Sequence, residues 1–154
     1  MVELSDSLCL PVVGDLKPEL SKHVDTRVKI LELQADQTLF LEGDEADFMF
    51  SVISGRLKVF RKSEGKNVYV RDLGPGESGG ITSIFLTKPR SATVTASEKT
   101  TIATLSKEDL DTAMEKHPAL ARGLLKILSR QVRSGGRSMA HLLKDTNDGR
   151  VQVA

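Results

Sequence analysis

Residues 76–94 read GESGGITSIFLTKPRSATV, and the interpretation of the whole chain starts from this stretch. The glycines at its start allow backbone amides to approach a ligand closely, and a short helical segment follows them. Arg90 then offers a planar guanidinium that suits a phosphate, with the Ser91 hydroxyl beside it. Taken singly, such glycines also fit plain turns and such an arginine a surface charge. Together and in this order they predict a pocket for one phosphate.

On both sides of this stretch the apolar residues recur with a period of two, which is typical of β-strands. The predicted strands are residues 28–33, 38–41, 48–53, 57–62, 68–70, 92–96 and 101–105. A four-residue connection, 63–66, is predicted to close one hairpin. Including shorter segments, we count about eight strands with turn signals every ~8–12 residues, a pattern typical of a sandwich, barrel or jelly roll.

After residue 105 the period changes to that of a helix. Ser106 and Asp109 have the spacing of a capping box, and Pro118 suits the first turn of a second helix. That second helix is predicted to end near Ser134, at Gly135–Gly136. It has a broad apolar arc and an opposite basic stripe. The stripe is either solvated or faces an acidic partner or a phosphate surface. The arc comprises Leu120, Leu124, Leu125, Ile127, Leu128 and Val132, and the stripe comprises Arg122, Lys126, Arg130 and Arg133.

These patterns predict an α+β fold: a β jelly-roll barrel of about eight strands, with a helical N-terminal lead-in and C-terminal helices. We expect the lead-in at 1–27, the barrel at 28–105, the C-terminal helices at 106–144 and a flexible tail at 145–154.

Composition excludes several classes of function. The 22 basic and 21 acidic residues nearly balance, so bulk charge does not predict nucleic-acid binding. Cys9 is the only cysteine, and neither a signal peptide nor the ~20 apolar residues of a membrane span is visible, so a cytoplasmic protein is expected. The histidines His23, His117 and His141 lie outside the strands and form no metal-ligand spacing. We therefore predict no enzyme, no catalytic residue, no metal and no cofactor.

The 76–94 stretch resembles the phosphate-binding cassette of the cyclic nucleotide-binding domain family, whose pattern is close to G-E-x-F-G-E-L-A-L-x-x-x-x-P-R-x-A-T-V. The resemblance covers roughly residues 38–134 and is most specific at 89–94. It implies that Arg90 pairs with the cyclic phosphate, that Ser91 contacts phosphate or purine, and that amides around Gly80 and Ala92 hold the ligand. The ligand-binding residues implied are Gly79, Gly80, Ile81, Thr82, Arg90, Ser91 and Ala92.

The chain departs from the family pattern at the glutamate that binds the ribose 2′-hydroxyl, because Ile81 occupies that position. A hydrogen bond to a charged group contributes ~1.5–3 kcal/mol, and a buried hydroxyl without a partner adds a similar cost. We therefore expect cyclic nucleotide binding roughly tenfold to several hundredfold weaker than with the glutamate.

Two functions follow from the resemblance. The first is a stand-alone regulatory module that binds cAMP or cGMP and signals through its C-terminal helices to a protein partner or a second copy. The alternative is a degenerate domain used for protein–protein interaction, or for another anion such as a cyclic dinucleotide. Only about twenty residues follow Ser134, too few for a DNA-reading domain, so no direct DNA binding is expected.

Overall fold

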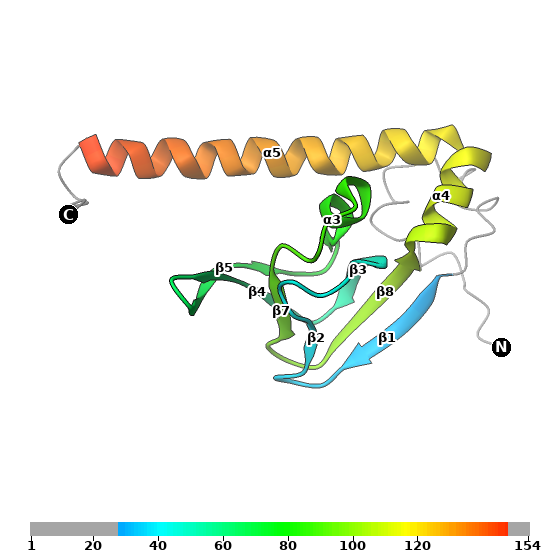
Figure 1. The fold of residues 1–154 in the computed structure, drawn as a ribbon, viewed down its shortest axis with the longest axis horizontal. Coiled ribbons are helices and arrows are strands. Elements are labelled where there is room, and N and C mark those ends of the chain that lie inside the picture. The colour runs from blue at the N-terminus through cyan, green and yellow to red at the C-terminus, as the bar shows by residue number, and fades with distance from the viewer. Residues whose placement is uncertain (1–27, 148–154) are drawn as a thin grey trace.

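A computed structural model describes residues 28–147, which form two antiparallel sheets closed at one end by helices (Figure 1). The predicted N-terminal lead-in, and the tail beyond Asn147, lie outside the described residues. One sheet has the strand order β1-β8-β3-β6 and the other β2-β7-β4-β5. The strands are β1 Lys29–Leu33, β2 Thr38–Phe40, β3 Phe48–Ser54, β4 Leu57–Ser63, β5 Lys66–Leu73, β6 Ser78–Gly79, β7 Thr93–Ala96 and β8 Thr100–Ser106. The eight-strand jelly-roll prediction is confirmed.

Apolar residues at alternate strand positions fill the space between the two sheets. This barrel core consists of Leu33, Phe50, Val52, Leu57, Leu73, Val94, Ala96 and Ile102. A second cluster lies between the sheets and the helices, and it consists of Met49, Ile81, Ile84, Leu105, Leu110, Ala113, Leu120 and Leu124. The helices are therefore fixed to the barrel by their own apolar faces.

The β4–β5 hairpin differs from the prediction at its turn. Ser63 pairs directly with Lys66, so the connection has two residues, Glu64 and Gly65, and not four. Both have positive φ, 50° and 75°. This is the type I′ arrangement, whose twist matches that of the flanking strands.

Three helices are described: α3 Ile81–Leu86, α4 Lys107–Lys116 and α5 Pro118–Asn147. The predicted cap of α4 is confirmed, because the Ser106 hydroxyl accepts a hydrogen bond from the Asp109 amide at 3.1 Å. No described helix has the length and apolarity that a membrane span requires.

The predicted end of the last helix at Gly135–Gly136 is wrong. α5 continues through both glycines to Asn147, and Figure 1 shows it running past α3 and beyond the sheets. Each glycine costs only about 1 kcal/mol relative to alanine inside a helix. No proline follows them, and the next residues include good helix formers such as Arg137 and Ala140. The helix also includes residues 145–147, where the sequence predicts a flexible tail.

Candidate phosphate-binding site

Arg90 is a buried cation without a hydrogen-bonded partner. Its side chain is 1% exposed, and the nearest carboxylate oxygen, Asp47 Oδ1, lies 3.8 Å from Nη2. None of its three side-chain nitrogens has a hydrogen-bond acceptor within the described chain. Native proteins rarely leave a buried charge in this condition, since each unpaired group costs free energy. The hydrogen-bond donors of the guanidinium are therefore available to an anion.

Two phenylalanine rings hold the Arg90 guanidinium in place. Its central carbon lies 4.1 Å from the ring centroid of Phe40 and 4.5 Å from that of Phe48. The two rings contact each other edge to face, with centroids 6.1 Å apart. A cation over an aromatic face is attracted by the ring quadrupole, so these rings replace part of the lost hydration.

The backbone fixes the other end of the residue. The Arg90 amide donates to the Asp44 carbonyl at 2.8 Å, and the Gly43 amide donates to the Arg90 carbonyl at 2.9 Å. Burial lowers the pKa of the guanidinium, while the carboxylates of Asp47 and Asp44 act in the opposite direction. An arginine ordinarily titrates far above neutral pH, so we treat the group as a cation.

Both glycines at the start of the cassette are required by close approach. A Cβ atom at Gly80 would lie 2.7 Å from Arg90 Nη1 and 3.1 Å from the Phe48 carbonyl oxygen, and the φ of Gly80 is +78°. A Cβ atom at Gly79 would lie 2.5 Å from the Phe50 ring. Gly80 is the N-cap of α3, and no side chain caps that helix end. The glycines thus let the cassette backbone pack against the buried arginine and the barrel core.

Arg90 lines a cavity of about 200 Å³. Six of the seven predicted ligand-binding residues line it: Gly79, Gly80, Thr82, Arg90, Ser91 and Ala92. The sequence thus located this site closely, although whether these residues bind a ligand remains a prediction.

Ile81 is the seventh, and the structure does not bring it to the cavity. It is 2% exposed and belongs to the cluster between barrel and helices, together with Ile84 and Leu110. Residues three apart share one face of a helix, so Ile81 and Ile84 enter the core together while Thr82 stays exposed at the cavity. The expectation that a ribose hydroxyl would face Ile81 and lack a partner there is therefore not supported by this geometry.

The sequence did not predict several of the residues that line this cavity. From the barrel come the apolar Phe40, Phe50, Val59, Val70, Leu73 and Val94, together with Arg61, Arg71 and Ser78. Ser83 comes from α3 and Gln131 from α5. The alternation of β4 indicated that Val59 and Arg61 share a face, but the sequence did not reveal which face lies inside. The phenylalanines around Arg90 gave no local signal, because 50 and 42 residues separate them from it in the chain.

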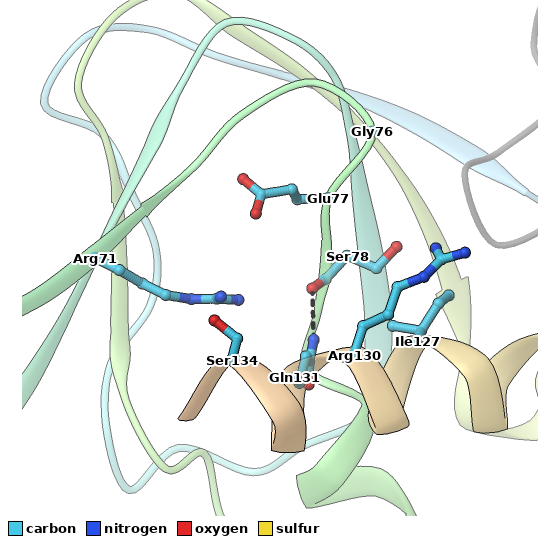
Figure 2. Close-up of a pocket in the computed structure, with 8 residues that line it drawn as sticks. All are labelled: Arg71, Gly76, Glu77, Ser78, Ile127, Arg130, Gln131 and Ser134. Atoms are coloured by element: carbon cyan, nitrogen blue, oxygen red, sulfur yellow. Dashed lines mark hydrogen bonds between the residues drawn. The ribbon is translucent and has the colours of Figure 1, made fainter. Parts of the chain in front are cut away.

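A second cavity, of about 220 Å³, adjoins the first between the barrel and α5 (Figure 2). The two cavities share Arg71, Ser78 and Gln131. The Gln131 side-chain amide donates to the Ser78 carbonyl at 3.3 Å, which joins α5 to the cassette strand β6. The rest of the second lining is Gly76, Glu77, Ile127, Arg130 and Ser134. The candidate site therefore extends from Arg90 to the long helix.

The model of the cyclic nucleotide-binding domain matches residues 30–117, more than half of the chain. The chain belongs to the cyclic nucleotide-binding domain family. Residues of the 76–94 segment, which resembles the phosphate-binding cassette of this family, line the cavity at Arg90. The family assignment made from the sequence is confirmed.

Relatives of the cyclic nucleotide-binding domain occur in different protein contexts. The N-terminal domain of a transcriptional regulator from Streptomyces coelicolor is 31% identical, with a TM-score of 0.67, over 81% of this chain and 90% of that one. The Thermus thermophilus catabolite activator protein is 27% identical, with a TM-score of 0.75, over 86% of this chain and 62% of that one. The Aspergillus oryzae lysophospholipase nte1 is 29% identical over 77% of this chain. This match spans only 8% of the lysophospholipase, so that enzyme's activity does not transfer to this chain.

Proposed function

We propose that this chain is a regulatory module that binds the phosphate of a cyclic nucleotide, cAMP or cGMP, on Arg90. The observation that carries the proposal is the guanidinium itself, which is buried, lies against two phenylalanine rings and has no hydrogen-bonded partner among the described residues. A phosphate oxygen would satisfy its donors and neutralise its charge. The Ser91 hydroxyl suits either purine, so the proposal covers both nucleotides.

The response to the ligand would pass through α5. Gln131 lines the cavity and binds the Ser78 carbonyl, so a ligand that enters between them changes this contact. A ligand shifts a conformational equilibrium only by its differential affinity for the two states. Because Ser78 and Gln131 line the same cavity, a bound ligand would have a different affinity for the state in which they are bonded and the state in which they are not. The proposal includes no catalytic residue and no cofactor. It places the protein in the cytoplasm, because a single cysteine fits a reducing compartment.

Calorimetric titration with cAMP and cGMP tests the proposal. Wild type is expected to bind weakly, because the described lining of the cavity offers no carboxylate to a ribose hydroxyl. Arg90→Gln should lose binding by more than about tenfold, since it removes a charge-assisted pair. Arg56→Gln is the matched control, because Arg56 is half exposed and pairs with Asp72 at 3.5 Å. Absence of binding at millimolar nucleotide, with Arg90→Gln behaving like wild type, rejects the proposal.

A second candidate function is assembly through α5, and the exposure of two apolar residues favours it. Leu125 is 63% exposed and Val132 is 76% exposed, seven residues apart on one helix. That spacing places them on the same stripe, as in a seam between two helices. The partner would be a second copy or another protein. Light scattering of wild type and Val132→Glu tests self-association. If both are monomers, the surface does not bind a second copy, and only a different protein remains as its partner.

A further inference from the structure

The first cavity contains more positive charge than one cyclic phosphate requires. Arg61 of β4 and Arg71 of β5 line it together with Arg90, and among the described residues its lining includes no aspartate or glutamate. A cyclic mononucleotide carries a single negative charge, which Arg90 alone would balance. Two cations therefore remain for another anionic group of the same ligand.

Strand geometry explains why both additional arginines face the cavity. Val59 and Arg61 are alternate residues of β4 and lie on one face of the sheet. Arg71 is the direct cross-strand partner of Val59. The register shifts between Val59 and Phe60, so β5 has an extra residue there, and Val70 joins the same lining. Alternation and cross-strand pairing thus bring one arginine from each strand to the same surface.

Within the part of the chain that the structure describes, neither Arg61 nor Arg71 has a side-chain partner. Arg61 and Arg71 make no ion pair and no side-chain hydrogen bond with any residue between 28 and 147. The neighbouring Arg56, in contrast, is paired with Asp72. Arg61 is exposed and Arg71 half-buried, so both are open to a ligand.

The second cavity gives a larger ligand room to extend. Arg71 lines both cavities, and Figure 2 shows it reaching from β5 toward the face of α5 that carries Ser134. Glu77 is the acidic residue of this second lining, and its Oε2 accepts the Gly74 amide at 2.6 Å. That hydrogen bond ties the carboxylate to the backbone of its own turn.

We propose that the preferred ligand carries two phosphate groups, one bound by Arg90 and the other by Arg61 and Arg71. This inference rests on the proposed function of the same site and names its ligand class. The absence of a carboxylate from the described lining of the first cavity agrees with it, because the ligand is then held by its phosphates and not by a ribose hydroxyl. Guanidinium groups recognise phosphate through paired, charge-assisted hydrogen bonds.

Calorimetry on the full chain tests this class with three probes: cAMP, cyclic di-adenylate and adenosine 3′,5′-bisphosphate. Cyclic di-adenylate carries its two phosphates within a ring, and the bisphosphate carries them on one open nucleotide. The two probes therefore distinguish a cyclic dinucleotide from an open bisphosphate as the ligand. At least one should bind about tenfold or more tightly than cAMP. Equal or tighter binding of cAMP relative to both overturns the inference.

Substitutions locate the second phosphate. Arg71→Gln should weaken binding of the better two-phosphate probe by about tenfold and change the affinity for cAMP by less than about twofold. Arg61→Gln should have the same effect on both ligands, but a smaller one. Arg56→Gln is the control on the same hairpin and should change neither. Equal weakening of both ligands by Arg71→Gln overturns the assignment. Binding of cAMP that depends on Arg90, without preference for two phosphates, rejects this inference alone and leaves the proposed function standing.

Discussion

Arg90 Nη1 lies only 2.7 Å from the point that a Cβ atom at Gly80 would occupy. The start of α3 and the buried guanidinium are thus fitted to each other, although ten residues separate them in the chain. The arginine cannot move away easily, because the rings of Phe40 and Phe48 lie against it. This contact is the basis of the first prediction.

Gly80→Ala is expected to weaken anion binding by at least about tenfold, because the added methyl group displaces the guanidinium. Positive φ at a residue with a side chain also lowers the free energy of unfolding by about 1–2 kcal/mol. Gly65→Ala is the matched control, since its φ of +75° imposes the same strain while nothing lies within 4 Å. Titration and thermal unfolding of both variants check this, and equal affinity losses would contradict it.

Arg90→Met should abolish phosphate binding without destabilising the ligand-free protein. The substitution removes a buried, unpartnered charge and keeps an unbranched side chain between the two rings. We expect the free energy of unfolding to stay the same or to rise by about 1 kcal/mol. Arg56→Met, at an exposed ion pair, should change stability by less than about 1 kcal/mol. Denaturant unfolding measures both, and a fall of more than about 2 kcal/mol in Arg90→Met would show that the cation stabilises the empty fold.

Phe40→Leu should weaken phosphate binding by about two- to thirtyfold, because it removes the nearer of the two rings against Arg90. The Phe60 ring forms a comparable edge contact with Tyr69, at 6.1 Å, away from the arginine. Phe60→Leu is therefore expected to bind like wild type. Calorimetry on the two variants separates the cation–π contribution from a general loss of aromatic packing, which would affect both alike.

Ile81→Glu should not restore a ribose contact, although it recreates the family glutamate. The side chain lies in the cluster with Ile84 and Leu110, so a carboxylate there is buried without a partner. We expect a loss of about 3 kcal/mol or more in the free energy of unfolding. Thr82→Glu, at the exposed neighbouring position, should cost less than about 1 kcal/mol. Wild-type stability together with higher cAMP affinity in Ile81→Glu would mean that this side chain faces the cavity.

Gln131→Ala should loosen α5 from the barrel, because it removes the hydrogen bond to the Ser78 carbonyl. Such a bond contributes about 0.5–1.5 kcal/mol, so amide exchange in the following helical turns should rise by about two- to tenfold. Arg133→Ala, at an exposed position of the same turn, serves as the control. Hydrogen exchange measured by mass spectrometry checks both, and unchanged protection in Gln131→Ala would show that the helix is held by its apolar face alone.

Local patterns were sufficient for most of the fold. The alternation of β4 and the cap at Ser106 are short-range signals, and both elements form as expected. The errors also have local causes. The hairpin turn was read as four residues because alternation does not fix the last pair, and α5 passes through Gly135 because the cost of a glycine is smaller than the gain from a continuing helix.

The sequence by itself determined the family and the position of the phosphate-binding segment. Glycine at positions 79 and 80 and arginine at 90 are requirements of backbone approach and of charge, and both are readable in one short stretch. Only the tertiary structure decided which side chains surround that arginine and which way residue 81 points. Phe40, Arg61 and Arg71 reach the site through strand pairing across the barrel, and Ile81 leaves it for the helical core. Those outcomes depend on burial among residues distant in the chain, which no local pattern encodes.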